Sequence, residues 1–212
     1  MLIFGSVLTR FFLFPNRYHL PFYSIISASW KDGKTNTVQT IAGSLLVVCG
    51  KGNNGGDGFV IARAAAKDGW NVTALLAEGE PKTTDAITNF ELLHSLSVNI
   101  CADCTVLETQ HFDVVADALY GTGFHGALRP SGLAACGLMN RLHKSGAFVL
   151  AVDLPSGINT DTGEVAEGAA HADLTVTFDS YKPLHVAESS APLCGKIVCA
   201  DIGIRDEWHP EF

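Results

Sequence analysis

Three short polar segments of this 212-residue chain carry side chains that could do chemistry, and each follows an apolar run. They are residues 50–58 (Gly-Lys-Gly-Asn-Asn-Gly-Gly-Asp-Gly), residues 117–126 (Asp-Ala-Leu-Tyr-Gly-Thr-Gly-Phe-His-Gly) and residues 153–157 (Asp-Leu-Pro-Ser-Gly). Amides, carboxylates and hydroxyls on such turns can bind polar groups or a cation, and a carboxylate can also move a proton. Because each segment follows a predicted strand, we expect all three at the carboxyl edge of a parallel sheet, where α/β folds bind ligands.

The first segment has features both of a dinucleotide site and of a different kind of site. Residues 50–58 match the pattern G-x-G-x-x-G, and Glu78 lies near the end of the next predicted strand, as in dinucleotide-binding folds. However, Asp57 is expected at the start of the following helix, where a carboxylate would repel a pyrophosphate. The segment therefore suits hydroxyls, an amide or a cation better than phosphate, with simple helix capping as the structural alternative.

The second segment is the better candidate for binding phosphate. Residues 121–126 again match G-x-G-x-x-G, Arg129 follows closely, and a helix is predicted to begin at Ser131. Backbone N–H groups at a helix start favour an anion. Arg129 could equally be an exposed surface charge, and we interpret His125 as a surface or packing residue.

The third segment argues against hydrolase chemistry and suggests a cation. Ser156 does not lie in a G-x-S-x-G turn, which disfavours a nucleophilic serine. If Asn54, Asp117 and Ser156 converge, they supply oxygen ligands that carry a single negative charge. Divalent ions usually recruit more carboxylates than that, so a monovalent cation fits the charge better.

Alternating strands and helices are predicted to position these segments. Apolar runs predict strands at residues 45–49, 71–77, 98–100, 113–119, 147–152, 174–178 and 196–200. Helical periodicity predicts helices at residues 58–67, from Thr83 or Thr84 onward, and at residues 131–144. This alternation predicts an α/β fold, a doubly wound and mostly parallel sheet in three αβα layers, with residues 45–204 as one domain.

Four motifs occur in an order and spacing that resemble a known family. They are residues 53–57 (Asn-Asn-Gly-Gly-Asp), 117–123, 153–157 and 201–204 (Asp-Ile-Gly-Ile). The chain resembles the YjeF N-terminal domain family, which includes the NAD(P)H-hydrate epimerases. The resemblance implies a Rossmann-like fold and the interconversion of the R and S epimers of hydrated NADH or NADPH. It also implies a homodimer and a dehydratase as the functional partner in nicotinamide nucleotide repair.

The resemblance also implies roles for individual residues. Potassium would be bound by Asn54, Asp117 and Ser156. Epimerisation replaces a hydroxyl by water from the other face, which requires proton transfer; Asp153 is our first candidate for it and Asp57 the second. The substrate would contact Asn53, Asn54, Gly55, Gly56, Asp57, Gly121, Thr122, Gly123, Phe124, His125, Gly126, Ala127 and Asp153.

These motifs leave open the role of Lys182 and two other functions of the chain. Lys182 could help to hold the substrate, but we interpret it instead as a surface lysine whose ammonium reaches water. A non-catalytic binding or scaffold module would have the same fold. An NAD-dependent dehydrogenase would rest on G-x-G-x-x-G and Glu78.

Composition excludes several classes of protein. A net charge of −8 argues against nucleic-acid binding, and 47% hydrophobic with 17% charged residues indicates a packed core. The first apolar run is too short to span a membrane. Of the six cysteines only Cys101 and Cys104 have C-x-x-C spacing, with no second pair for zinc, so we expect reduced packing thiols.

Residues 1–44 differ from the rest of the chain. They hold four basic residues against Asp32 alone, whereas residues 45–212 are strongly acidic. They do not match the helices that family members usually carry before the first strand, so we interpret them as a leader or a degenerate helical cap. Residues 205–212 form a C-terminal tail. A transit peptide should be richer in serine and more amphipathic, and we expect a cytoplasmic protein.

Overall fold

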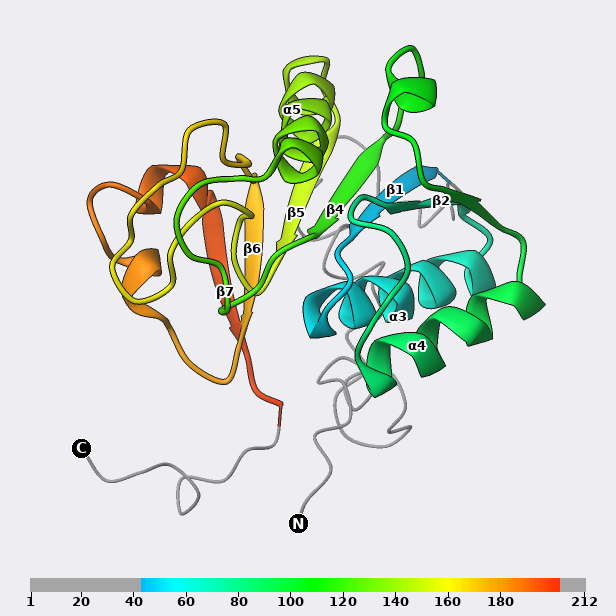
Figure 1. Ribbon diagram of the computed structural model, residues 1–212, viewed down its shortest axis with the longest axis horizontal. Helices are drawn as coiled ribbons and strands as arrows, with labels where there is room; N and C mark the ends of the chain where they lie inside the picture. Colours follow the sequence, from blue (N-terminus) through cyan, green and yellow to red (C-terminus); the bar gives the residue numbers. More distant parts are fainter. Residues whose placement is uncertain (1–42, 203–212) are drawn as a thin grey trace, which may run out of the picture.

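Seven strands of the described residues pair into one parallel sheet in the order β3-β2-β1-β4-β5-β6-β7 (Figure 1). The structure is a computed structural model that describes residues 43–202, so the tail and most of the atypical segment 1–44 lie outside the described residues. Apolar side chains on both faces of the central strands favour a sheet covered on both sides. The strands are β1 (Ser44–Cys49), β2 (Asn71–Leu76), β3 (Val98–Cys101), β4 (Val114–Ala118), β5 (Phe148–Val152), β6 (Leu174–Phe178) and β7 (Lys196–Ala200).

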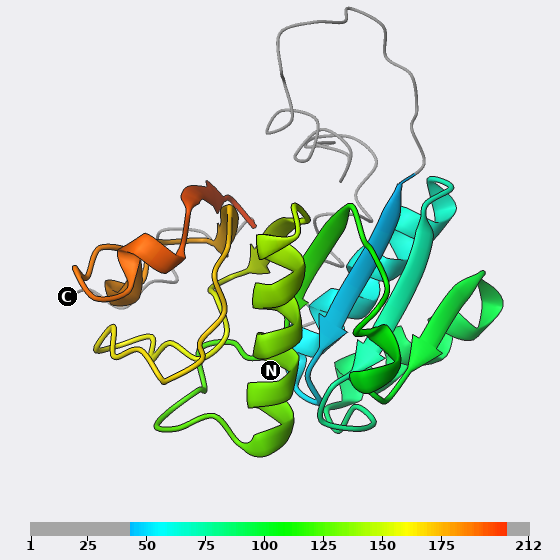
Figure 2. The same cartoon turned by 90° about the horizontal axis from the view of Figure 1, so that it is seen from above.

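Helices cover the two faces of this sheet and complete three layers (Figures 1 and 2). Alternate residues of β1 divide between the faces: Val47 packs with Phe59 in one core, and Val48 packs with Met139 in the other. This alternation confirms the predicted αβα arrangement. The α-helices are α3 (Asn53–Lys67) and α4 (Thr84–Glu91) on one face and α5 (Pro130–Lys144) on the other. The short 3-10 helices are η1 (Leu92–Ser95), η2 (Thr105–Leu107), η3 (Pro183–His185) and η4 (Ala191–Leu193).

The strand order reverses between β1 and β4. From β1 the chain continues through α3 to β2, and from β4 it continues through α5 to β5 on the opposite side. The connections that leave the carboxyl ends of β1 and β4 therefore diverge, which opens a crevice of the kind that binds ligands in α/β folds.

Helix α3 begins five residues earlier than the sequence predicted. Gly52 is its N-cap, no side chain caps it, and its first backbone bond runs from the Gly56 N–H to the Gly52 carbonyl at 3.1 Å. The prediction failed because glycines disfavour helices in isolation, whereas here they allow close packing. A Cβ atom on Gly55 would lie 1.8 Å from the carbonyl oxygen of Gly50.

The connections on either side of β6 contain no α-helix. Residues 153–173 and 179–195 form loops with two 3-10 helices, and they pack around a small core of their own. That core consists of Leu154, Ile158, Ala169, Leu184 and Cys194.

Two further features concern the cysteines and the length of the helices. All six cysteines are free, and Cys49, Cys136 and Cys194 are buried. Among the described residues, no helix combines the length and apolar character that crossing a membrane requires.

Candidate active site

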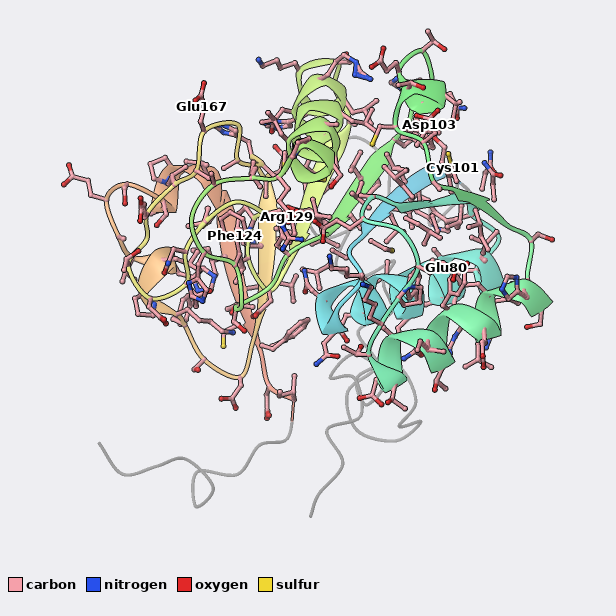
Figure 3. The ribbon with its side chains drawn as sticks, viewed as in Figure 1. Glu80, Cys101, Asp103, Phe124, Arg129 and Glu167 are labelled. Carbon is pink, nitrogen blue, oxygen red and sulfur yellow. The ribbon has the colours of Figure 1, made fainter. Side chains whose placement is uncertain are left out.

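The carboxyl edge of the sheet borders a cavity of about 650 Å³. The start of α3, the segment between β4 and α5, and the turn after β5 all reach it. Phe124 and Arg129 both lie on the segment that joins β4 to α5 (Figure 3). Of the predicted substrate-contact residues, those that line the cavity are Asn53, Asn54, Asp57, Gly121, Thr122, Gly123, Phe124, His125, Ala127 and Asp153.

The remaining predicted substrate-contact residues do not line the cavity. Gly55 and Gly56 lie inside α3 and pack it closely, since a Cβ atom on Gly56 would lie 3.1 Å from the Cα atom of Ala86 in α4. Gly126 has a φ of +75°, a conformation that glycine adopts without strain. These glycines thus shape the backbone around the cavity.

Asp57 lies in the second turn of α3 rather than at its start, because the helix begins at Asn53. The side chain is buried and borders the cavity. The expected repulsion of a pyrophosphate at the helix start therefore does not come from this carboxylate. Lys51 and Gly52, which precede the helix, line the cavity there instead.

Asn54 and Ser156 both bond to the backbone of Tyr120, and Asp117 joins this group through Ser156. The Asn54 amide donates to the Tyr120 carbonyl at 2.9 Å, and the Tyr120 N–H donates to the Ser156 hydroxyl at 2.9 Å. Ser156 in turn donates to Asp117 twice, from its hydroxyl at 2.6 Å and from its N–H at 2.7 Å. The structure thus brings together the three residues predicted to bind a cation.

Asp117 is a fully buried carboxylate without a positively charged neighbour among the described residues. Burial raises the pKa of Asp117 to about 6, although hydrogen bonds from Ser156 and from the Leu119 N–H oppose this rise. In the described part of the chain, no cluster of three His, Cys, Asp or Glu side chains could hold a metal ion. The oxygen donors around Asp117 suit a hard cation of low charge.

Asp153 follows β5 in an unusual backbone conformation. Its φ of +70° is in the left-handed region, which non-glycine residues rarely adopt. Its Oδ1 atom accepts bonds from Lys182 Nζ at 2.5 Å, from Thr177 Oγ1 at 3.0 Å and from the Phe178 N–H at 3.1 Å. The carboxylate at the cavity is therefore ion-paired and anchored to β6.

The interpretation of Lys182 as a surface lysine is wrong. Only 17% of its side chain is exposed, and its ammonium also donates to Thr177 Oγ1 at 2.7 Å and to the Phe178 carbonyl at 2.8 Å. His185 lies nearby and is buried. The sequence did not indicate it as a site residue. A lone lysine and histidine on a loop gave no signal that could place them beside Asp153.

A second cluster of charged and polar groups also lines the cavity. Tyr120 donates its hydroxyl to Glu78 Oε1 at 2.7 Å, and Lys51 and Arg129 lie 3.6 and 3.9 Å from the same carboxylate. Burial and the bond to Glu78 raise the pKa of Tyr120. Three partners thus already hold Glu78, the carboxylate on which the dehydrogenase alternative rests.

His125 and Arg129 are both exposed, and both also line the cavity. Arg129 is 67% exposed and also lines the cavity. His125 is exposed, lines the cavity, and its Nδ1 atom lies 3.1 Å from the side-chain amide of Asn159. The sequence did not predict Lys51, Gly52, Leu119, Tyr120 and Phe178 as cavity residues.

Comparison with known proteins places this chain in a known family. The family described as YjeF-related protein N-terminus matches residues 23–184. A bifunctional NAD(P)H-hydrate repair enzyme Nnr from Methanothermobacter thermautotrophicus is 38% identical over 174 residues, which cover 77% of this chain and 32% of that protein. This chain therefore spans about a third of the length of that relative.

Two further proteins match over most of their own length. An NAD(P)H-hydrate epimerase from Limosilactobacillus fermentum is 35% identical over 161 residues, which cover 76% of this chain and 75% of that protein. A crystal structure of a yeast protein, ynu0, superposes with a TM-score of 0.61 at 22% identity, covering 88% of this chain and 72% of that chain. The yeast structure supports the fold alone.

Proposed function

This chain belongs to the YjeF-related N-terminal family, and from that premise we propose that it interconverts the R and S epimers of hydrated NADH and NADPH. The observation that carries the proposal is one cavity bordered by Asp57, Asp153 and the glycine-containing residues 121–125. The relative from Limosilactobacillus fermentum, which this chain covers over most of its length, has the name of an NAD(P)H-hydrate epimerase.

The chemistry requires two proton transfers. The hydroxyl on the hydrated carbon departs as water after it receives a proton, and the C–O bonding electrons leave with it. Water then attacks the ring cation from the other face, forms the new C–O bond and releases a proton. One water leaves and one enters, so no proton is consumed. Carboxylates at the cavity can carry these protons; Asp153 is the first candidate and Asp57 the second.

The segment between β4 and α5 is suited to the anionic part of the substrate. This segment contains Gly121 and Gly123, which carry no side chain. Helix α5, which follows it, begins at Pro130 and has no acidic residue in its first turn. Arg129 lines the same cavity and supplies a positive charge. We assign the phosphate-bearing part of the substrate to residues 121–127.

Potassium is the cation that we propose for the group formed by Asn54, Asp117 and Ser156. When bound, a potassium ion would supply a single positive charge beside the Asp117 carboxylate. That carboxylate is fully buried, and none of the described ion pairs includes it. Ionised groups in such surroundings are costly unless a counter-charge is present.

Epimerisation implies a partner reaction. A dehydratase that accepts one epimer would consume the product and restore the reduced nucleotide. The bifunctional relatives, of which this chain spans about a third, carry repair activity in a longer protein. We propose that this chain works with such a dehydratase, and that it does so as a homodimer.

The test is the clearance of R-NADHX in potassium buffer with an excess of a dehydratase specific for the S epimer. The purified protein is expected to accelerate clearance, and Asp153→Asn to reduce that acceleration at least ~100-fold, because general acid–base catalysis is worth about 10²–10⁴. Asparagine tolerates the left-handed backbone of this position, so the variant isolates the lost charge.

Asp161→Asn is the matched control, since Asp161 is exposed in the loop that follows the same strand. Its activity should equal that of the unmodified protein. No acceleration by the unmodified protein would disprove the proposed function. Full activity of Asp153→Asn with loss of activity in Asp57→Asn would move the proton transfer to Asp57.

A further inference from the structure

The two oxygens of the Asp153 carboxylate have different surroundings. Oδ1 accepts three hydrogen bonds, from Lys182 Nζ, Thr177 Oγ1 and the Phe178 N–H. No donor from the described residues reaches Oδ2. Because a carboxylate oxygen with three donors has little capacity left, Oδ2 is the atom of this side chain that can exchange a proton in the cavity.

Lys182 has no donor left for a substrate. An ammonium group has three N–H bonds, and those of Lys182 go to Asp153 Oδ1, to Thr177 Oγ1 and to the Phe178 carbonyl. The side chain is mostly buried. The ammonium therefore fixes the orientation of the Asp153 carboxylate and does not contact the substrate.

His185 fixes the backbone of Asp153. Its Nδ1 atom accepts the N–H of Lys182 at 3.0 Å, which leaves the proton on Nε2, and Nε2 lies 3.1 Å from the Asp153 carbonyl. Burial lowers the pKa of His185, which favours the neutral ring that this bonding pattern needs. A left-handed backbone is strained for a non-glycine residue, and the bond from His185 helps to hold Asp153 in this conformation.

From these contacts we infer that Lys182 and His185 are positioning residues that hold Asp153 with Oδ2 toward the cavity. The inference rests on the proposed function and names the reacting atom. Oδ2 takes a proton from water as the oxygen of that water forms the C–O bond. In the reverse direction it returns the proton to the hydroxyl as the C–O bond breaks.

Lys182→Ala tests the role of the ammonium. We expect kcat for epimerisation to fall ~10–100-fold while KM changes less than about 2-fold, because the substrate does not contact Lys182. Adding propylammonium should restore at least about a tenth of the lost kcat, whereas propanol should restore none. Lys196→Ala, which removes an exposed lysine at the start of β7, is the control and should keep full activity.

Thr177→Val is a second variant that keeps the shape of the side chain. It removes one donor to Oδ1 and one acceptor of Lys182, so kcat should fall about 3–10-fold at unchanged KM. His185→Phe should lower kcat similarly, without rescue by the amine.

The outcomes separate this inference from the proposed function. An inactive unmodified protein would disprove the function itself. An active protein whose kcat is unchanged in both Lys182→Ala and Thr177→Val would overturn the inference alone. A rise in KM with constant kcat in Lys182→Ala would also overturn it, because that result would place Lys182 on the substrate.

Discussion

One aspartate directly precedes β4 and another lies near its carboxyl end, and their pKa values are shifted in opposite directions. Asp113, at the amino edge of the sheet, accepts bonds from the Ser44 N–H at 2.7 Å and the Ser44 hydroxyl at 2.8 Å, and these bonds lower the pKa of Asp113. Asp117, at the carboxyl edge, is fully buried, and burial raises its pKa to about 6. The pKa of the same residue type is thus shifted in opposite directions within five residues of one chain.

The neighbouring strands repeat this contrast. At the amino edge, Asp173 accepts the Val149 N–H at 2.8 Å and lies 3.0 Å from His143 Nε2, so it links β5 to α5. At the carboxyl edge, Asp153 has a left-handed backbone and needs Lys182 as its counter-ion. Aspartates at the amino edge join adjacent strands, whereas those at the carboxyl edge are costly to hold. Costly ionisable groups in a cavity are typical of functional sites.

Gly55→Ala should produce the largest effect on the carboxyl edge. Its Cβ atom would lie 1.8 Å from the Gly50 carbonyl oxygen and 2.7 Å from the Gly50 carbonyl carbon. Neither backbone atom can move without displacing the end of β1, so we expect a loss of more than about 4 kcal/mol in the free energy of unfolding. Urea denaturation followed by circular dichroism measures this loss.

Gly52→Ala is the matched control on the same edge. No atom lies within 4 Å of the Cβ atom that this substitution adds, so the free energy of unfolding should change by less than about 1 kcal/mol. Equal effects of the two substitutions would show that close packing is not the reason for glycine at Gly55.

Much of the fold follows from the sequence because it depends on local patterns. Apolar runs such as residues 174–178 and 196–200 coincide with β6 and β7 in full. Strand ends followed by polar turns also led to the correct edge of the sheet. Asn54, Asp117 and Ser156 meet there as expected, because consecutive parallel strands present their carboxyl ends together.

The remainder depends on contacts between distant parts of the chain. The start of α3 could not be predicted, because the packing of Gly55 against Gly50 overrides the poor helix propensity of glycine. Lys182 and His185 are separated from Asp153 by 29 and 32 residues, and both lie in the irregular connection that follows β6. Side-chain networks of this kind leave no pattern in a single sequence.

Potassium should stabilise the protein only when Asp117 is ionised. The pKa of Asp117 in the folded state is about 6, above its ordinary value of 3.8, so its charge lowers stability as the pH rises through this range. A bound cation offsets that cost. We expect 100 mM potassium to raise Tm by about 4 °C at pH 7.5, equivalent to about 1–2 kcal/mol, and to have little effect at pH 4.5.

The same scan in choline chloride at equal ionic strength separates binding from screening. Ser156→Ala should remove most of the potassium effect, because Ser156 contributes a hydroxyl to the group around Asp117. A potassium effect of equal size at both pH values would contradict a cation bound to this carboxylate.

Asp113→Asn should have the smallest effect and should leave catalysis unchanged. The substitution keeps an oxygen that can accept the Ser44 N–H but removes the negative charge that strengthens this bond. Because the bonds from Ser44 lower the pKa of Asp113, their contribution is present at neutral pH and disappears as the pH falls below about 3.8, the ordinary value for Asp. We expect the variant to lose about 1 kcal/mol at pH 7 and this difference to shrink as the pH is lowered below the ordinary Asp value, as measured by urea denaturation over that pH range. A change in epimerisation rate without a change in stability would mean that the amino edge also serves the reaction, and the contrast between the two edges would fail.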